Sequence, residues 1–393
     1  GPYDGRSALE PARPRPARMP ERLRIGYFSA DFHNHATMFL MARMIELHDR
    51  DRFAIHAYSY GPDEQDAMRR RLVDAVEVFH DVRLLNDRSI AELARREKID
   101  IAIDLKGYTR STRSGIFGFR PAPVQINYLG YPGTMSADFI DYIIADPVVI
   151  PEHLRDGYSE KVIALPHSYQ CNDDQRAISD RPISRGEAGL PQDGFVFACF
   201  NNSYKITPDA FDIWMRLLTR IDGSVLWLMR ANDRVEINLA KEAARRGVDP
   251  ARLIFAPRAA LPEHLARHRL ADLFLDTFNF NAHTTASDAL WAGLPVLTKL
   301  GENFAARVAG SLLTAMGLPE LITETARDYE RLALELATDR DRLSAIRAKL
   351  AAQRLTAPLF DSPRFTRHIE NAYVSAYQRH VDGLAPDHID IAP

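Results

Sequence analysis

Short apolar runs alternate with amphipathic stretches from Leu23 onward, and this alternation predicts strands and helices in turn. The string "RLRIGYFSADF" contains an apolar run over residues 24 to 29, and a polar loop separates it from the helical pattern of "ATMFLMARMIELHD". The unit recurs, with strands predicted at "AIHAYSY", "EVFHDV" and "IDIAIDL" and helices around residues 64 to 75 and 88 to 97. Because strands that alternate with helices usually pair in parallel, a parallel sheet covered by helices is predicted.

The pattern changes between Arg120 and Pro166 to the shorter runs "PVQINYL", "DYIIAD" and "KVIALP", which Pro and Gly turns such as "GYPGT" separate. We expect this part to form the cleft-facing edge of a first domain. A polar stretch without periodicity follows, and the alternation then restarts. Strands are predicted at "FVFACF", "VLWLMR", "RLIFAP", "ADLFLD" and "PVLTK", with helices at about 208 to 220, 233 to 246, 262 to 269 and 285 to 292. The second half is therefore predicted to be another doubly wound α/β domain.

The length of 393 residues agrees with two such domains. The chain starts with Gly-Pro, a common scar of tag cleavage, and continues rich in Pro and Arg, so its beginning is interpreted as a tag remnant and a linker within a longer polypeptide. The predicted parts are this remnant (1–21), an N-terminal Rossmann-like domain (22–170), an interdomain linker (171–193), a C-terminal Rossmann-like domain (194–357), and a C-terminal helix with a tail that packs back on the first domain (358–393).

Charge and cysteine usage narrow the class of protein. Fifty Lys and Arg residues against 53 Asp and Glu give a net charge of −3, so neither nucleic acid nor an anionic membrane is an expected partner. Cys171 and Cys199 are the only cysteines, which suits a reducing, cytoplasmic location. No apolar run approaches the ~20 residues that span a bilayer, and no secretory signal is visible.

Ligands of open α/β sheets bind beyond the carboxyl ends of the strands, and one such loop carries polar chemistry. After "ADLFLD" comes "TFNFNAHTTASDALWAGLPVLT", in which Thr285 and Asp288 have the spacing of a capping box. One interpretation is a capped helix. The other is a diphosphate site, because His283, Thr284, Thr285 and backbone N–H groups meet at the positive end of a helix.

Three further loops carry candidate residues. Lys205 in "NNSYKITP" directly follows a strand and is expected to neutralise a phosphate leaving group. His264 and Arg267 are three apart on a predicted helix, where they either contact a base or lie on a basic surface. His33 and His35 precede the first helix; no further Cys or His completes a metal site with them, so acid or base catalysis by one histidine is favoured.

Several motifs are missing from the sequence: GxxxxGK[ST], GxGxxG after the first strand, GxSxG and HExxH. P-loop ATPase, Rossmann dehydrogenase, α/β-hydrolase and zincin activities therefore have no support. No carboxylate motif for holding a nucleotide-bound metal is evident either. The remaining interpretation is a protein that uses a nucleotide diphosphate by means of a helix dipole, a lysine and a histidine.

Long strings carry a resemblance to a known family. They are "GYFSADFHNHAT", "RPAPVQINYLGYPGT", "CFNNSYKITP", "SVLWLMR", "ADLFLDT", "NAHTTASDALWAGLPVLT" and "GENFAARVAGSLLTAMGLPELI". They resemble, in order from Leu23 to about His380, the catalytic region of the O-linked N-acetylglucosamine transferases, glycosyltransferase family 41, and most closely its bacterial members. The resemblance implies a GT-B fold, two Rossmann-like domains with a cleft between them, the first on the acceptor side and the second holding the nucleotide sugar.

The resemblance also implies an activity: inverting transfer of N-acetylglucosamine from UDP-GlcNAc to Ser or Thr hydroxyls of proteins, without a metal or other cofactor. His35 matches the proposed general base, which either takes the acceptor proton or orients sugar or acceptor. Asp104, at the end of the strand predicted at "IDIAIDL", is the second candidate for the general base. Lys205 matches the lysine that helps UDP leave. The remaining donor-binding matches are Asn202 at the diphosphate or ribose, Ala259, His264 and Arg267 at the uridine, His283, Thr284 and Thr285 at the diphosphate, Asp288 at the ribose, and Gly133 and Thr134 near the sugar.

The sequence departs from the animal enzymes at Leu261, where they carry Lys, and at Asn202, where they carry Gln. Retention of His283 and Asp288 favours UDP-GlcNAc over the GDP-fucose of related plant O-fucosyltransferases. Tetratricopeptide repeats, which present protein acceptors in the family, are expected in the full-length chain. Two alternatives stay open: a transferase with another nucleotide sugar or acceptor, such as a glycan, a lipid or a flagellin-type protein, and a non-catalytic GT-B relic that binds UDP or protein.

Overall fold

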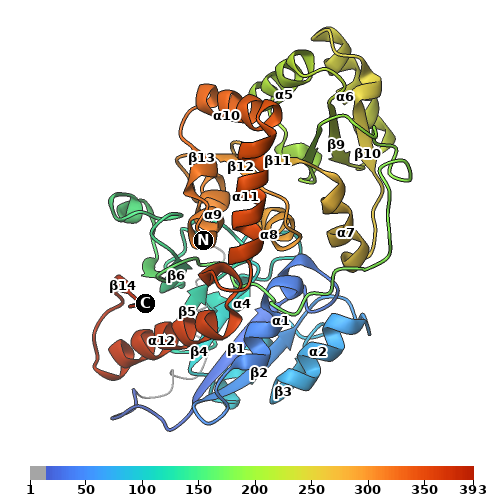
Figure 1. Ribbon diagram of the computed structural model, residues 1–393. Helices are drawn as coiled ribbons and strands as arrows, with labels where there is room; N and C mark the ends of the chain where they lie inside the picture. Colours follow the sequence, from blue (N-terminus) through green and yellow to red (C-terminus); the bar gives the residue numbers. More distant parts are fainter. Residues whose placement is uncertain (1–14) are drawn as a thin grey trace. The chain divides into compact units, whose positions relative to one another are not determined.

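The computed structural model describes residues 15–393, and these divide into two compact units (Figure 1). Unit 1 comprises the chain up to Asp174 and again from Phe360 to Pro393, and unit 2 comprises Gln175–Leu359. Most of the predicted tag remnant and linker, residues 1–14, lies outside the described residues.

Unit 1 is built on one parallel sheet. Its strands are β1 (Leu23–Ser29), β2 (Phe53–Ser59), β3 (Val78–Asp81), β4 (Ile101–Asp104), β5 (Val124–Asn127), β6 (Tyr142–Ala145), β7 (Lys161–Ala164) and β14 (Ile389–Asp390). They lie in the order β14-β7-β6-β5-β4-β1-β2-β3, and neighbouring strands are parallel throughout. Nearly every residue of β1, β2 and β4 is buried, as expected of parallel strands covered on both faces.

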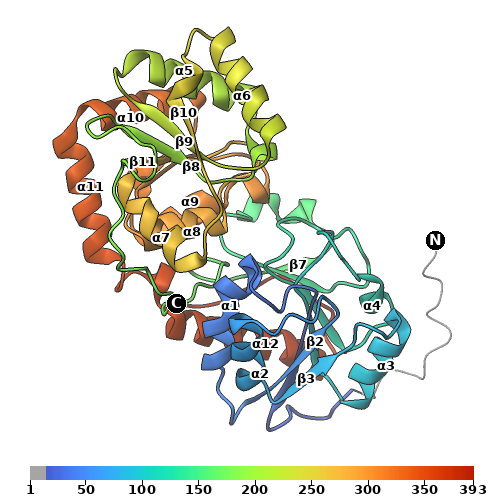
Figure 2. The same ribbon diagram turned by 90° about the vertical axis from the view of Figure 1, so that its right-hand side faces the viewer.

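Helices cover both faces of this sheet. They are α1 (Ala36–Leu47), α2 (Ala67–Ala75), α3 (Asp87–Arg96), α4 (Gly115–Gly118) and α12 (Ser362–Val381), with a 3-10 turn η2 (Glu152–Gly157). Figure 2 shows α1, α2 and α12 on one face and α3 and α4 on the other. The long helix α12 is held by buried hydroxyls, since Tyr373 lies 3.0 Å from the Tyr27 hydroxyl and Tyr377 donates to Asp100 at 2.9 Å.

Unit 2 repeats the architecture with a sheet of its own. Its strands are β8 (Val196–Cys199), β9 (Val225–Met229), β10 (Leu253–Ala256), β11 (Leu273–Leu275), β12 (Val296–Lys299) and β13 (Ile322–Thr323). Its helices are α5 (Pro208–Arg220), α6 (Asp233–Arg245), α7 (Leu261–Arg267), α8 (Thr284–Trp291), α9 (Val308–Met316), α10 (Ala326–Thr338) and α11 (Arg340–Gln353). Its 3-10 turns are η3 (Ser203–Lys205), η4 (Pro250–Arg252), η5 (His268–Leu270), η6 (Phe304–Ala306), η7 (Pro319–Leu321) and η8 (Pro358–Phe360). The parallel strand order is β10-β9-β8-β11-β12-β13, and Figure 2 shows α7 and α8 opposite α5 and α10 across the sheet.

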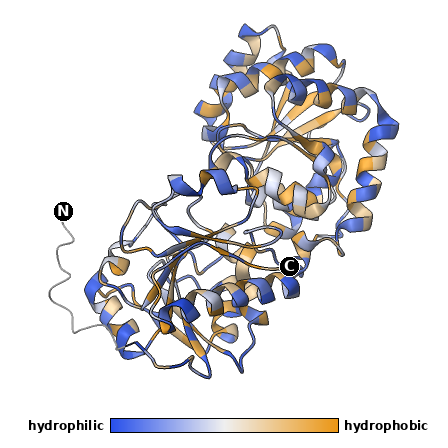
Figure 3. Cartoon of the chain, turned by 90° about the vertical axis from the view of Figure 1, so that its left-hand side faces the viewer, coloured by the Kyte–Doolittle hydropathy of each residue, from blue (hydrophilic) through white to orange (hydrophobic). Residues whose placement is uncertain are grey.

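The predicted fold class, α/β with two Rossmann-like doubly wound domains, is therefore confirmed. Figure 3 shows hydrophobic residues concentrated in the strands of each sheet, which is the pattern that the sequence displayed. Every strand predicted from an apolar run is present, with its ends within about two residues of the prediction. The helix predicted at 64 to 75 begins later, at Ala67, because the Asp66 side chain accepts the Arg69 N–H and caps it there.

The polar segment predicted as an interdomain linker, residues 171–193, is shared between the units. Asp173 and Asp174 belong to unit 1, and the segment from Gln175 belongs to unit 2. In unit 2, Arg185 donates to the carbonyls of Leu270 and Gly194. The segment lacks periodicity because side-chain to backbone contacts, rather than a helix or strand, hold it in place.

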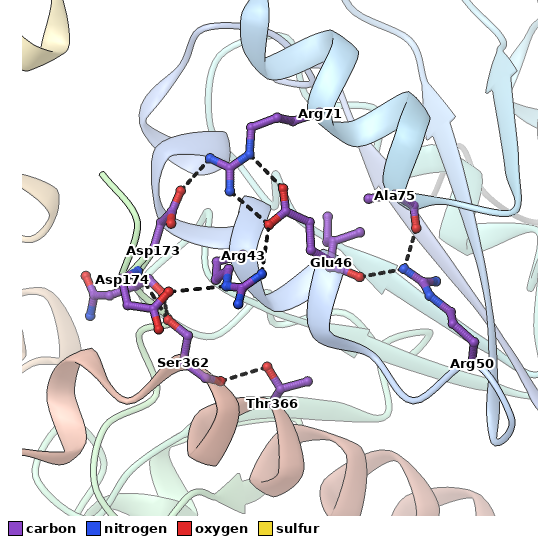
Figure 4. A network of polar contacts seen from close by, with 11 residues as sticks. Arg43, Glu46, Arg50, Arg71, Ala75, Asp173, Asp174, Ser362 and Thr366 are labelled. Atoms are coloured by element: carbon purple, nitrogen blue, oxygen red, sulfur yellow. Dashed lines mark hydrogen bonds and ion pairs between the residues drawn. The ribbon is translucent and has the colours of Figure 1, made fainter. Parts of the chain in front are cut away.

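Figure 4 shows the ion-pair network that holds the first residues of this segment, Asp173 and Asp174, within unit 1. Arg71 of α2 donates to Glu46 of α1 at 2.7 Å and to Asp173 at 2.6 Å. Arg43 donates to Asp174 at 3.3 Å. The Asp173 side chain is fully buried, whereas that of Asp174 is one quarter exposed. Arg71 therefore neutralises a buried carboxylate, whereas Arg43 neutralises a partly exposed one.

We expect Arg71→Met to destabilise unit 1 by about 2 to 4 kcal/mol, because it removes a guanidinium from a buried carboxylate. Arg43→Met is the matched control, with about 0 to 1 kcal/mol expected for its more exposed pair. All three tryptophans, Trp214, Trp227 and Trp291, lie in unit 2. Tryptophan fluorescence therefore reports the unfolding of unit 2, whereas far-ultraviolet circular dichroism reports both units. For Arg71→Met, we expect the urea midpoint measured by circular dichroism to fall more than the midpoint measured by fluorescence. Equal midpoints for the two variants would contradict the prediction.

Candidate functional site

The loop between β11 and α8 places several polar groups at the start of a helix. His283 precedes α8, and no described side chain caps that helix. Of the two interpretations, the capping box is therefore wrong: the Thr285 hydroxyl instead donates to Asn201, and Asp288 pairs with Arg176. Both partners are distant along the chain, so local spacing alone could not show them. The positive end of the α8 dipole is left without a side-chain cap, which suits an anionic ligand.

Lys205 lies in η3, directly after β8 and before the Pro-initiated α5, as the sequence predicted. Its ammonium Nζ donates to the Asn281 carbonyl at 2.9 Å and lies 4.0 Å from the centre of the Phe280 ring. Burial lowers the pKa of Lys205 to about 8, although the charge of nearby Asp276 opposes the shift. Burial also raises the pKa of Asp276 to about 6. Lys205 is thus a partly dehydrated cation, whose field is stronger than that of a solvated lysine.

His283 packs against the same aromatic ring. Its imidazole stacks on Phe280 with ring centres 4.7 Å apart, and Nε2 lies 3.0 Å from the Ala305 carbonyl. A carbonyl can only accept, so Nε2 carries the proton and Nδ1 is an acceptor. Burial lowers the pKa of His283 to about 3, with Lys205 contributing in the same direction. His283 is therefore a neutral hydrogen-bonding group beside Lys205.

Asn201 connects three parts of this site and was missed by the sequence interpretation. Its buried amide donates to Asp276 at 3.3 Å and to Thr277 at 2.8 Å, while its carbonyl oxygen accepts from Thr285. The neighbouring Asn202, which the resemblance favoured, is exposed. The only available signal for Asn201 was that it directly follows a buried strand. Phe280, in the loop that the sequence singled out, and Asp276, the last residue of the predicted strand before it, were also missed.

Asp288 is held by a buried arginine. The Arg176 guanidinium lies 2.5 Å from the Asp288 carboxylate and 3.3 Å from Ser287 Oγ, and it covers the Trp291 ring at 5.6 Å. Burial raises the pKa of Asp288, while the charge of Arg176 opposes the shift. A carboxylate offers about four acceptor sites, so this pairing leaves capacity for a further donor. Arg176, in the predicted linker, was not recognised from sequence.

His264 and Arg267 lie together on α7, as their spacing predicted. Arg267 Nε donates to His264 Nδ1 at 3.0 Å and Nη1 donates to the Pro257 carbonyl at 2.6 Å. Arg267 is 5% exposed, so it orients His264 rather than lying on a basic surface. Burial strongly lowers the pKa of His264 and keeps its ring neutral. Ala259, also predicted here, is exposed, and Leu261 is the half-buried first residue of α7.

In unit 1, His35 caps the start of α1 and meets two charged side chains. Its Nδ1 accepts the Thr37 N–H at 3.2 Å and lies 3.6 Å from Asp31 Oδ2. The same Asp31 oxygen is 2.6 Å from Lys106 Nζ, and both of those residues are buried. Burial lowers the pKa of His35, whereas the Asp31 charge raises it. When Nδ1 accepts the Thr37 N–H, the neutral ring carries its proton on Nε2. In the other tautomer Nδ1 donates to the Thr37 hydroxyl, 3.2 Å away, and Nε2 is free to accept a proton.

The loop that carries Lys106 is fixed by Asp104, the rival base considered from sequence. Asp104 is 1% exposed and accepts the N–H groups of Lys106 and Gly107 at 2.8 and 3.0 Å. Its position favours a role in shaping the loop. No metal-ligating group found among residues 15–393 includes His33 or His35.

The "GYPGT" turn in unit 1 is fixed by a buried acid. Glu160, 1% exposed, accepts from the Thr134 hydroxyl at 2.6 Å and from the Met135 N–H. Asn127 donates to the Gly133 carbonyl at 3.2 Å. Gly130 is required at the start of the turn, because a Cβ there would lie 1.8 Å from the Leu105 carbonyl oxygen. Gly133 and Thr134 are thus held in a set geometry by residues that the sequence did not reveal.

The fold and the polar strand-end loops define an α/β protein of the GT-B type that is suited to a nucleotide diphosphate. Comparison with known proteins identifies the family: the model of glycosyl transferase family 41 matches residues 12–182 and 180–369. The chain therefore belongs to that family. A mutant of the Thermobaculum terrenum O-GlcNAc transferase superposes with a TM-score of 0.86 at 31% identity, covering 92% of this chain and 69% of that one.

Curated relatives of this chain have names that agree with this family. The probable UDP-N-acetylglucosamine–peptide N-acetylglucosaminyltransferase SEC of Arabidopsis thaliana is 40% identical over 94% of this chain and 39% of its own length. The Caenorhabditis elegans UDP-N-acetylglucosamine–peptide N-acetylglucosaminyltransferase is 31% identical over 94% of this chain and 42% of its own. The chain thus spans about two fifths of the length of these relatives. Anabaena HepE in complex with UDP and glucose, 14% identical with a TM-score of 0.62, shows the same fold.

Proposed function

We propose that this protein is an inverting glycosyltransferase that moves N-acetylglucosamine from UDP-GlcNAc to Ser or Thr hydroxyls of proteins. The observation that carries the proposal is the partly dehydrated Lys205 ammonium, which lies with neutral His283 against Phe280 at the uncapped start of α8. This arrangement suits the diphosphate of a departing UDP. The names of these curated relatives support the donor and the peptide acceptor.

The donor is proposed to bind residue by residue as follows. The diphosphate accepts hydrogen bonds from the N–H groups of Thr284 and Thr285 and from the Thr284 hydroxyl, with His283 beside it and Asn202 at the diphosphate or ribose. The uracil stacks on His264, which Arg267 orients, near Ala259. Asp288, paired with Arg176, accepts from ribose hydroxyls. Gly133 and Thr134 are proposed to contact the transferred sugar.

The transfer is proposed to be a single in-line displacement. The acceptor oxygen attacks the anomeric carbon as the bond to the UDP oxygen breaks, which inverts that carbon. His35 takes the acceptor proton at Nε2 in the tautomer whose Nδ1 donates to the Thr37 hydroxyl, and the nearby Asp31 carboxylate stabilises the imidazolium that forms. Lys205 and the α8 dipole stabilise the negative charge that develops on UDP, the role that a metal ion plays in other transferases. No metal or cofactor is proposed for this step.

The surroundings of the catalytic region are proposed from the same family. Tetratricopeptide repeats that present protein acceptors are proposed for the full-length chain, and a bacterial source is proposed from the resemblance. Within residues 15–393, no helix combines the length and apolar character needed to cross a bilayer. Cys171 and Cys199 are both free and buried, which supports a reducing, cytoplasmic location.

The direct test is UDP or GDP release from a panel of nucleotide sugars, with protein acceptors and with a chelator present. We expect turnover only with UDP-GlcNAc, unchanged by the chelator. Turnover with another nucleotide sugar, or with a glycan or lipid acceptor alone, would replace the proposed substrates. Tight UDP binding without turnover on any acceptor would favour the non-catalytic relic.

The lysine also predicts a pH dependence. Its pKa is lowered to about 8 by burial, and the ammonium is the form that stabilises UDP. We therefore expect kcat/KM for UDP-GlcNAc to fall about tenfold per pH unit above about pH 8, the slope for loss of one proton. In the pH profile of kcat, we expect the corresponding fall at a higher pH than in the profile of kcat/KM, because bound diphosphate stabilises the ammonium. A kcat/KM profile that stays flat to pH 10 would contradict this role.

A further inference from the structure

One group of metal-type side chains in unit 1 takes no part in the proposed transfer. His56 lies in β2, His80 in β3, and Glu97 directly after α3. Tyr58 pairs with His80 in the parallel register, and side chains two apart on a strand share a face, so both histidines lie on the Tyr58 face of the sheet. Tyr58 packs in one cluster with Ile90 and other residues of α3, so this is the face that α3 covers.

The three side chains approach one another closely. One candidate ligand atom from each residue lies within 4.8 Å of the others. Tetrahedral zinc with bonds of 2.0–2.2 Å requires separations of about 3.4 Å. The ligand atoms therefore lie within about 1.4 Å of the separations that zinc requires, a difference that side-chain rotation can close. Tyr58 stacks on the His80 ring at 4.7 Å and fixes its plane.

The histidines carry unmet polar groups. His56 is 5% exposed, and its Nδ1 has no hydrogen-bond partner among residues 15–393; the same is true of the buried Nε2 of His80. Buried polar groups without a partner are costly and call for an explanation such as an ion.

We propose that His56, His80 and Glu97 form a binding site for a divalent transition metal, best suited to Zn²⁺. Two imidazole nitrogens and a carboxylate are a zinc ligand set, and water fills the fourth position, since His80 and Glu97 are only half-buried. The ion ties the edge strand β3 to β2 and to the end of α3 and thereby stabilises this edge of the sheet. It uses none of the residues proposed for donor binding or catalysis, and this inference does not rest on the proposed function.

The test titrates the chelator-treated protein with ZnCl2 in a calorimeter, and with CoCl2 in a spectrophotometer. We expect about one Zn²⁺ per chain, a rise in Tm on binding, and a Co²⁺ absorption typical of four or five ligands. Glu97→Gln and His80→Asn are expected to weaken zinc binding at least tenfold. Glu97→Gln preserves side-chain size at a half-buried position, so it tests the site without a cavity.

His368→Asn is the matched control. The His167 and His368 rings lie 5.6 Å apart in the same unit, but they belong to no metal-ligating group found in the described residues. This variant is expected to bind Zn²⁺ like the parent protein. Equal affinity of Glu97→Gln and the parent protein, or an absence of stoichiometric binding, would overturn the proposal. Circular dichroism of each variant shows whether lost binding reflects lost folding.

Discussion

Lys205→Met is expected to lower kcat by about 10²- to 10³-fold while UDP affinity falls far less, because electrostatic groups at a developing charge act mainly in the transition state. Methionine keeps the length and apolar stem of the side chain, so contact with Phe280 is retained. The expected result is a protein that binds UDP but releases it from UDP-GlcNAc very slowly. Single-turnover kinetics and UDP calorimetry together measure the two effects.

Lys299→Met is a close control for that variant. Lys299 Nζ lies 4.9 Å from the centre of the Phe278 ring in unit 2, so it is another lysine over an aromatic ring. It belongs to β12 and has no proposed role with the donor. We expect near-normal kcat for this control. Near-normal kcat for Lys205→Met would remove Lys205 from the mechanism.

His35→Gln is expected to lower kcat by about 10²- to 10⁴-fold, the usual contribution of a general base. Glutamine retains an acceptor for the Thr37 N–H at the start of α1 but cannot take a proton at the acceptor. The variant is also expected to lose the acid limb of the kcat/KM pH profile. In the parent enzyme we expect that limb at a lower pH than for an ordinary histidine, since burial lowers the pKa of His35 and a base acts when neutral.

His33→Gln controls for the loss of a neighbouring ring. The His33 and His35 rings lie 5.7 Å apart, so general disturbance of the loop affects both positions. We expect the His33 variant to keep both its rate and its acid limb. If His35→Gln kept the parent rate, His35 would be a binding or capping residue, and another group or water would take the proton.

The architecture was largely predictable because apolar runs of parallel strands are strong local signals. "IDIAIDL" and "FVFACF" each predicted a buried strand, and β4 and β8 occupy them. The edge strand β14 was not predicted, since two residues display no period. It forms because Ile389 and Asp390 pair with β7, a partner more than 200 residues away.

The candidate site was predictable in its loops but not in its contacts. The strand-end rule and the resemblance led to Lys205, His283 and the start of α8. The contact partners of the α8 residues lie in other parts of the chain: Asn201 accepts a hydrogen bond from Thr285, and Arg176 pairs with Asp288. Local spacing predicted a capping box for these two residues, and tertiary contacts override it. Asn201 and Asn202 are adjacent in sequence, so only the backbone direction after β8 decides which of the two is buried.

The central claim is that this protein itself transfers N-acetylglucosamine from UDP-GlcNAc to protein hydroxyls. Mass spectrometry of a protein acceptor, incubated with the enzyme and UDP-GlcNAc in the presence of a chelator, tests it most directly. We expect Ser or Thr residues of the acceptor to gain N-acetylhexosamine, and we expect this gain to be lost with Lys205→Met and kept with Lys299→Met. An unmodified acceptor alongside released UDP, or equal modification by both variants, would contradict it.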